Sequence, residues 1–296
     1  MGLELPKRAR NLVAGAATGS ALLFLSGCSV DENSDIKRLA MPIPATKEAH
    51  HIYDLWAWSW LAAMATGVIV WGLMFYAVVK FRRRSETDIP VQTRYNLPIE
   101  IFYTVAPVMM VIVFFFWTVH TQDEVLHAPK DVDKANAQAY SNVLVVGQQW
   151  SWTFNYTKGS DVVASEPVWE AGTPDKIPTL WLVKDKTVSF DLYSPDVIHS
   201  FWVPVFLFKM DVVPGRASEN HFTFTPDRAG TFDGRCAELC GVYHSRMLFK
   251  VKVTDQASFD AHLKQLQAAG NTGLNAPGNF ANEVAGREGT SNGGEE

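Results

Sequence analysis

The chain has 296 residues, of which 47% are hydrophobic, 12% aromatic and 19% charged. A composition this rich in apolar residues excludes a disordered or collagen-like chain. The formal net charge of −5 argues against a nucleic-acid-binding protein, which would be basic. Three cysteines are too few for a small scaffold held together by disulfides.

Residues 1–27 have the pattern of a bacterial signal peptide. Lys7, Arg8 and Arg10 form a basic start, and the apolar stretch over residues 11–27 is too short for a stable membrane span. The stretch ends in L-S-G-C at Cys28, which resembles a lipobox, where the signal peptide is removed and the cysteine is lipidated. That resemblance implies a lipoprotein that begins at Cys28 on the outer face of the plasma membrane. A plain signal peptide followed by a chance cysteine is the alternative.

Two later apolar segments are long enough to cross a membrane. Residues 55–79 are uncharged and would form a helix of about 37 Å, against a hydrocarbon core of about 30 Å. Residues 101–119 are also uncharged and would form a helix of about 28 Å. The loop between them, residues 80–100, carries five basic side chains, so the positive-inside rule places it in the cytoplasm. We therefore expect an outer segment over residues 28–52, a transmembrane hairpin over residues 53–120, and an outer domain beyond it. A helical hairpin buried in a soluble protein is the alternative.

Glu100 lies at the cytoplasmic start of the second predicted span. A carboxylate there is favoured by the helix dipole. An ionisable residue at the membrane edge can also belong to a proton path. Both roles remain open from the residues alone.

The outer part of the chain has the pattern of a β domain. After a polar connector over residues 121–139, short β-forming segments alternate with turn signals. The predicted strands cover residues 142–146, 150–156, 179–183, 187–193, 200–206, 220–224 and 247–253. Strands at this spacing indicate a sandwich or barrel within residues 140–255. Residues 256–268 predict an amphipathic helix, and residues 269–296 predict a disordered, glycine-rich tail.

A cluster of candidate metal ligands lies near the end of this β domain. Residues 236–247 read C-A-E-L-C-G-V-Y-H-S-R-M, which places two thiols, an imidazole and a thioether within twelve residues. Sulfur ligands select copper, zinc or iron–sulfur clusters, and a methionine favours copper. A mononuclear blue-copper site uses a single cysteine, so the pair Cys236 and Cys240 suggests two bridged copper ions. A second histidine is also needed, and the candidates are His199, which is the best placed, and His221, His120 and His127.

Two other interpretations of the cysteine pair remain open. In an oxidising compartment Cys236 and Cys240 could form a disulfide. A structural zinc site is the second alternative. His244 and Met247 at loop spacing favour copper over both.

These motifs resemble subunit 2 of cytochrome c oxidase, of the haem–copper superfamily, in its dinuclear copper A type and its bacterial, actinobacterial-like lipoprotein form. The pattern C-x-E-x-C-G-x-x-H-x-x-M over residues 236–247 is similar to the family's copper A motif. The segments at residues 97–101, 147–152, 194–204 and 209–216 resemble other parts of the family pattern. The resemblance implies a two-helix transmembrane hairpin plus an all-β cupredoxin-like Greek-key barrel.

The resemblance also implies the metal ligands. Cys236 and Cys240 would bridge both copper ions. One copper ion would be completed by His199 and Met247, and the other by His244 and the backbone carbonyl of Glu238. The Glu238 side chain would reach a magnesium or manganese ion shared with subunit 1.

Other residues would serve electron and proton transfer. Trp150 would be the ring through which electrons arrive, and Glu100 would lie at the entrance of the proton path into subunit 1. Asp196 would help to dock a basic cytochrome. Asp211 and Arg216 would belong to the polar network between the copper centre and the haem propionates.

On this interpretation the chain is the electron-transfer subunit of a proton-translocating oxidase, a translocase. It would accept electrons from cytochrome c and pass them to haem in subunit 1, and would contain no oxygen-reducing site itself. Its partners would be subunits 1 and 3, membrane lipid and a cytochrome c that is soluble, membrane-bound or fused to a bc complex, alone or in a supercomplex. Gln148 and Pro195 depart from the family pattern and leave the identity of the donor open.

Three other functions are weighed against this one. A quinol oxidase subunit 2 would lack the copper cysteines, and a copper A domain of nitrous-oxide reductase would not need the two spans. A membrane-anchored copper chaperone or store, a non-redox function, would need neither Trp150, Glu100 nor Glu238.

Overall fold

The computed structural model describes residues 37–85, 87, 89, 91–126, 140–173, 175–215 and 220–276. The chain divides into two compact units, Met1–Ile43 and Pro44–Glu296. In the first unit the described residues, 37–43, contain a turn over residues 37–40. The predicted signal peptide with Cys28, most of the connector and most of the tail lie outside the described residues.

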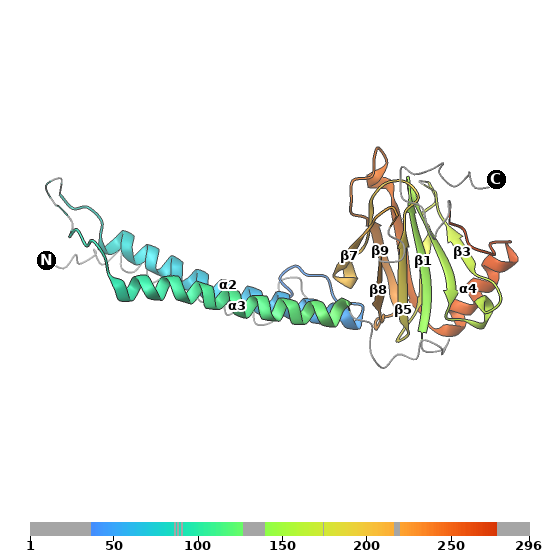
Figure 1. Cartoon of the computed structure of the whole chain (residues 1–296), viewed down its shortest axis with the longest axis horizontal. Helices are drawn as coiled ribbons and strands as arrows, with labels where there is room; N and C mark the ends of the chain where they lie inside the picture. Colours follow the sequence, from blue (N-terminus) through green and yellow to red (C-terminus); the bar gives the residue numbers. More distant parts are fainter. Residues whose placement is uncertain are drawn as a thin grey trace, which may run out of the picture. The chain divides into compact units, whose positions relative to one another are not determined.

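Two long apolar helices open the second unit (Figure 1). Helix α2 spans Lys47–Lys80 and helix α3 spans Leu97–Leu126. The hydroxyl of Thr46 caps α2 by accepting a hydrogen bond from the N–H of Ala49 at 3.1 Å. Both helices extend beyond the predicted spans because their polar ends remain helical, whereas the absence of charge marks only their central parts.

Both helices are long and apolar enough to cross a membrane, and the most apolar window of each is 0% buried by the rest of the chain. The core helix of a soluble protein would be covered instead. The alternative of a helical hairpin buried inside this chain is therefore wrong. The two helices fit a membrane anchor for the β domain that follows.

The β domain consists of two five-stranded sheets. Their strand orders are β3-β2-β1-β5-β8 and β4-β10-β9-β6-β7. Each sheet is mixed, because β1 runs parallel to β5 and β10 runs parallel to β4. The strands are β1 (Tyr140–Gln148), β2 (Ser151–Lys158), β3 (Val168–Ala171), β4 (Thr179–Val183), β5 (Thr187–Tyr193), β6 (His199–Val203), β7 (Phe208–Val212), β8 (His221–Phe224), β9 (Gly230–Cys236) and β10 (Leu248–Thr254).

Strands β3, β7 and β9 are absent from the prediction. Strand β9 contains charged residues and glycines that disfavour an isolated strand. Gly234 is needed there because a Cβ at this position would lie 2.2 Å from the ring of Phe249. The predicted strand over residues 200–206 ends early, at Val203, because Pro204 lacks an N–H and begins the 3₁₀ turn η3 (Pro204–Phe206).

An aromatic core joins the two sheets. The buried Trp152 of β2 packs against Phe201 of β6 at 5.8 Å and Phe249 of β10 at 5.4 Å between ring centroids. Helix α4 (Gln256–Ala268) covers one end of the sandwich and buries Phe259 and Leu263. Because β6, β9 and β10 carry or border the candidate ligands, this core holds the backbone of the site.

The first residues of α2 and the segment just before it are hydrogen-bonded to the β domain. The N–H of Lys47 donates to the carbonyl of Thr225 at 3.0 Å, and the N–H of Thr225 donates to the buried Glu48 carboxylate at 2.9 Å. The N–H of Ala45 donates to the carbonyl of Val205 in η3 at 3.0 Å. The chain is thus fastened to the β domain where α2 begins.

Candidate metal centre

Strand pairing and one loop bring the predicted metal ligands together. His199 begins β6 and Cys236 ends β9, and these strands pair so that Phe201 lies opposite Cys236. Cys240, His244 and Met247 follow in the loop between β9 and β10, which closes with the 3₁₀ turn η4 (His244–Arg246). We call residues 236–247 the copper loop.

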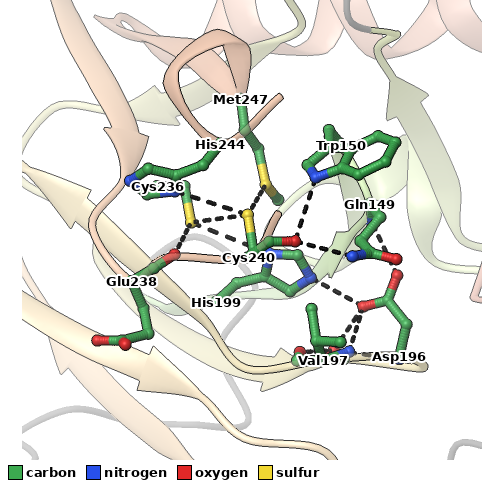
Figure 2. Close-up of polar contacts among 11 residues, drawn as sticks. Gln149, Trp150, Asp196, Val197, His199, Cys236, Glu238, Cys240, His244 and Met247 are labelled. Atoms are coloured by element: carbon green, nitrogen blue, oxygen red, sulfur yellow. Dashed lines mark hydrogen bonds and ion pairs between the residues drawn. The ribbon is translucent and has the colours of Figure 1, made fainter. Parts of the chain in front are cut away.

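The donor atoms surround the two sulfur atoms (Figure 2). The Sγ atoms of Cys236 and Cys240 are 3.9 Å apart. His199 Nδ1 lies 3.9 Å from the sulfur of Cys236, and the carbonyl oxygen of Glu238 lies 3.2 Å from the same atom. His244 Nδ1 and Met247 Sδ lie 3.6 and 3.8 Å from the sulfur of Cys240.

The chemistry of these donors fits copper. His199, Cys236, Cys240 and Met247 are buried, and both cysteines are free thiols. A disulfide is therefore not formed, and a zinc site would leave the buried thioether without a role. Sulfur and imidazole donors in a water-poor setting suit copper, and the two cysteine sulfur atoms with the four donors around them are enough for two ions.

The two thiols differ in acidity when no metal is bound. Burial acts to raise the pKa of Cys236, but hydrogen bonds with His199 and the backbone of Ser200 and Glu238 outweigh it, so that the pKa is lowered. Burial and then the negative charge of Cys236 raise the pKa of Cys240. A metal ion would therefore meet one thiolate first and would displace the proton of the second thiol.

Asp196 holds the His199 ring through the Nε2 atom of the ring. Its Oδ1 lies 2.8 Å from His199 Nε2, and its Oδ2 accepts the N–H of Gln149 at 2.7 Å. With the Nε2–H donated to Asp196, Nδ1 is left free to bind a metal, the usual arrangement of a metal-bound histidine. Burial acts to raise the pKa of Asp196, but its bonds to His199, Gln149 and Val197 outweigh it and the pKa is lowered. Asp196 is thus a carboxylate that orients the ring of a predicted ligand, His199, while its predicted role in docking stays a prediction.

Trp150 contacts the copper loop directly. Its indole N–H donates to the carbonyl of Cys240 at 3.2 Å, and the side chain of Gln149 donates to the same oxygen at 2.8 Å. Its ring packs edge-on against Tyr243 at 5.1 Å. Gly241 adopts φ +123°, and a Cβ there would lie 3.1 Å from the Trp150 ring, so the close approach requires glycine.

The contacts of Gln149, Tyr243 and Asp196 were missed by sequence reasoning. In the sequence, Tyr243 lies between two predicted ligands and Gln149 lies next to Trp150. This closeness in the chain to predicted functional residues was the signal that could have pointed to both. Asp196 precedes His199 by three residues, which was the signal for a bond to the ring.

The structure separates the four histidine candidates. His199 reaches the sulfur atoms, whereas His221 lies exposed on β8 opposite Asp191, and His120 lies on α3 beside Trp117 at 5.7 Å. His127 lies outside the described residues.

Other predicted residues lie apart from the cluster. The Glu238 carboxylate is exposed and points away from the sulfur atoms, while its carbonyl faces Cys236 (Figure 2). Asp211 is exposed on β7, and Arg216 and Cys28 lie outside the described residues. Glu100 accepts the backbone N–H of Asn96 at 2.8 Å at the start of α3, a helix-capping contact.

Comparison with known proteins identifies the family. The family model "Cytochrome C oxidase subunit II, periplasmic domain" matches residues 141–254. "Probable cytochrome c oxidase subunit 2" of Streptomyces avermitilis is 44% identical, with 89% of each chain covered. The chain belongs to the cytochrome c oxidase subunit 2 family. "Cytochrome c oxidase subunit 2" of Mycobacterium tuberculosis is 33% identical, covering 86% of this chain and 82% of the relative.

Among solved structures, the chain resembles the periplasmic domain of subunit II of cytochrome oxidase from Bradyrhizobium japonicum. The identity is 26% and the TM-score 0.38, over 44% of this chain and 94% of that domain. The predicted family is confirmed. So is the predicted fold class of two long apolar helices and a cupredoxin-like β domain, which the helices and the two sheets display directly.

Proposed function

We propose that this chain is the subunit that receives electrons from cytochrome c for a proton-translocating oxidase. Its ligands for a dinuclear copper A centre are Cys236, Cys240, His199, His244, Met247 and the carbonyl of Glu238. A copper pair held by these residues would supply one-electron redox chemistry, which would let electrons reach haem in subunit 1. The observation that carries this proposal is the convergence of three side-chain donors and one carbonyl on the two cysteine sulfur atoms.

The protein holds the ligands in position, buries most of them away from water and provides a path for the electron. Strands β6 and β9 hold His199 and Cys236 on paired backbones, so that these ligands move little. Asp196 keeps the proton on His199 Nε2 and leaves Nδ1 facing the sulfur atoms. The Trp150 indole reaches from the surface to the carbonyl of Cys240, which provides a hydrogen-bonded path for an electron toward a ligand.

The membrane parts complete the proposal. The basic loop at residues 80–100 keeps the turn of the hairpin inside, so both ends of the hairpin and the copper domain lie outside, with a lipid anchor at Cys28. Subunits 1 and 3 would surround α2 and α3. Glu100 would serve proton uptake at the inner end of α3, and the exposed Glu238 carboxylate would meet magnesium or manganese at subunit 1. Oxygen reduction would take place in subunit 1.

A copper chaperone is the second candidate. It would need an accessible, labile site for a single ion, whereas four of the donor side chains here are buried. Metal analysis of the full-length chain in detergent separates the two. The proposal predicts two copper ions per chain that survive dialysis against a weak chelator. One weakly held ion per chain would support the chaperone.

A further inference from the structure

Helices α2 and α3 lie side by side (Figure 1), and two cavities open between them. Their volumes are about 470 and about 490 Å³. Both are lined by Ser59 and Phe114, so they form one continuous groove. The groove extends over residues 51–71 of α2 and residues 110–124 of α3. We call it the hairpin groove.

The cavity at one end of the hairpin groove is charged. It lies where α2 begins and α3 ends, and Asp54 and Glu124 line it from the two helices. Both residues are exposed, and among the described residues that line the groove there is no lysine or arginine. The rings of Trp58 and Trp117 line the same cavity. Two carboxylates beside two indole rings are suited to an organic cation, through charge-assisted hydrogen bonds and cation–π contacts.

The cavity at the other end is lined by small and apolar side chains. Ser59, Ala63 and Gly67 follow one another at every fourth residue, so they lie on one face of α2. Their small size leaves the groove open, and a Cβ on Gly67 would meet nothing within 4 Å. Val70 and Met110 line this part from the two helices. It suits an apolar chain, because a polar group here would find few hydrogen-bond partners.

The length of the groove corresponds to one leaflet of a bilayer. At 1.5 Å per residue the groove runs about 21 Å along α3 and about 30 Å along α2. One leaflet with its headgroups is about 20–22 Å thick, which is half of the full bilayer. Trp58 and Trp117 lie at the charged end, where an interfacial aromatic belt is expected. The occupant therefore needs a charged head at the membrane surface and an apolar tail in the core.

A metal ion is a poorer occupant of the charged end. His51 and His120 also line this cavity, beside the two carboxylates. Among the described residues, however, the only group of such donors that converges closely enough for a metal ion is the one at the copper loop. The two imidazoles can instead donate N–H groups to an anionic oxygen. The charged end thus offers acceptors for a cation and donors for an anion, as a zwitterionic headgroup requires.

We infer that the hairpin groove binds a zwitterionic phospholipid with a primary ammonium headgroup, such as phosphatidylethanolamine. The ammonium group pairs with Asp54 and Glu124, and the phosphate accepts N–H groups from the two histidines. One acyl chain lies along the small residues of α2 at Gly67. An anionic lipid without the ammonium group is disfavoured, because the two carboxylates repel it. This lipid site is separate from the copper centre and goes beyond the proposed function.

A transmembrane helix of another subunit is the competing occupant. Such a helix would need a basic side chain at the level of Asp54 and Glu124, because an apolar helix would leave two carboxylates without a partner. A phospholipid of the stated kind brings its own ammonium group. Exposed apolar side chains outside the groove, among them Val68 and Phe116, remain for the proposed contacts with subunits 1 and 3.

Lipid binding by the full-length chain in detergent tests the inference. Native mass spectrometry counts bound dioleoyl phosphatidylethanolamine or dioleoyl phosphatidylglycerol as each is titrated. The wild type should bind the ethanolamine lipid about tenfold more tightly than the glycerol lipid. The double variant Asp54→Asn/Glu124→Gln should bind the ethanolamine lipid about tenfold more weakly and lose this preference. Asp123→Asn removes an exposed carboxylate of α3 that does not line the groove, and should behave like the wild type.

The apolar part of the groove has its own matched pair of variants. Gly67→Leu and Gly72→Leu place the same side chain on α2, at positions where a Cβ meets nothing within 4 Å. Of the two, only Gly67 lines the groove. Gly67→Leu should therefore weaken binding of the ethanolamine lipid about tenfold by filling the space of the acyl chain, while Gly72→Leu binds as the wild type does. Circular dichroism establishes that each variant is folded.

Three results would overturn the inference. The first is equal affinity of the wild type for the two lipids. The second is unchanged binding of the ethanolamine lipid in either Asp54→Asn/Glu124→Gln or Gly67→Leu. The third is loss of the catalytic subunit from the purified oxidase complex in Gly67→Leu but not in Gly72→Leu, because the groove would then be a subunit contact. Copper content enters none of these results, so the inference can fail while the proposed function holds.

Discussion

Asp196 offers the sharpest test of how the protein prepares the metal centre. Its two carboxylate oxygens serve different partners, since Oδ1 contacts His199 Nε2 at 2.8 Å and Oδ2 accepts the N–H of Gln149 at 2.7 Å. Oδ1 also accepts the N–H of Val197 at 2.6 Å and the hydroxyl of Ser194 at 3.2 Å. In Asp196→Ala all of these partners lose their acceptor, and the His199 ring is fully buried. Hydrogen bonds to a charged group contribute about 1.5–3 kcal/mol each, so loss of the two bonds to His199 and Gln149 should cost the metal-free chain about 3–6 kcal/mol of unfolding free energy.

The effect on copper binding follows from the orientation of His199. Loss of the group that accepts the second ring N–H of a metal-bound histidine typically costs about 10–100-fold in metal affinity. We expect that range for Asp196→Ala. Asp196→Asn retains a single acceptor oxygen, which can serve either His199 or Gln149 but not both, and should therefore lie between Asp196→Ala and the wild type.

Competition with a copper chelator, followed by the visible absorption of the bound metal, measures these affinities. Asp211→Ala is the matched control, because Asp211 is an exposed acidic residue on β7 and is not one of the donor residues. Circular dichroism of each variant establishes that the β domain is folded. Wild-type copper affinity in a folded Asp196→Ala protein would refute the role given to this carboxylate.

Three further predictions concern the electron path, pH and the C-terminal helix. Trp150→Phe keeps an aromatic ring but removes the indole N–H bond to the loop carbonyl. Reduction of the centre by cytochrome c should therefore slow at least tenfold in stopped-flow while the copper spectrum stays the same, and an unchanged rate would exclude this path. The pKa of Asp196 is lowered in the folded chain, so the unfolded chain takes up a proton at this group at a higher pH than the folded chain does. The stability contributed by this group is therefore fully present above its ordinary pKa and is lost as pH falls through the lowered value. Urea unfolding of the metal-free chain between pH 3 and 7 should show this loss and a shallower one in Asp196→Asn; equal slopes would contradict it. His262→Ala removes a ring that is stacked on Trp181 at 4.1 Å and hydrogen-bonded to Glu170 at 2.8 Å. This loss should cost about 1–2 kcal/mol of unfolding free energy without changing copper affinity. A loss of copper would show that α4 acts on the centre.

The copper loop could be predicted from sequence because its ligands are close together in the chain. The short spacing in sequence brings Cys236, Cys240, His244 and Met247 into one loop, and the residue types select copper. The fifth side chain could only be ranked among candidates, because His199 reaches the others through the pairing of β6 with β9. Strand β9 itself carries little β propensity and forms because it has neighbours on both sides, β10 and β6.

Contacts made by residues far apart in the chain could not be predicted. The bond between Gln149 and Cys240 joins residues 91 positions apart, and the bond between Asp196 and Gln149 joins residues 47 apart. Neither motif spacing nor periodicity contains such information. The contact of Tyr243 with Trp150 belongs to the same class.

The central claim is that two copper ions share the cysteine sulfur atoms. Electron paramagnetic resonance of the oxidised, copper-loaded full-length chain tests it most directly. An electron shared by two copper nuclei gives more hyperfine lines than an electron confined to one, and we predict this shared-electron spectrum in the wild type and its loss in Cys236→Ser. A four-line spectrum of a single copper ion in the wild type, or a spectrum that Cys236→Ser leaves unchanged, would contradict the account.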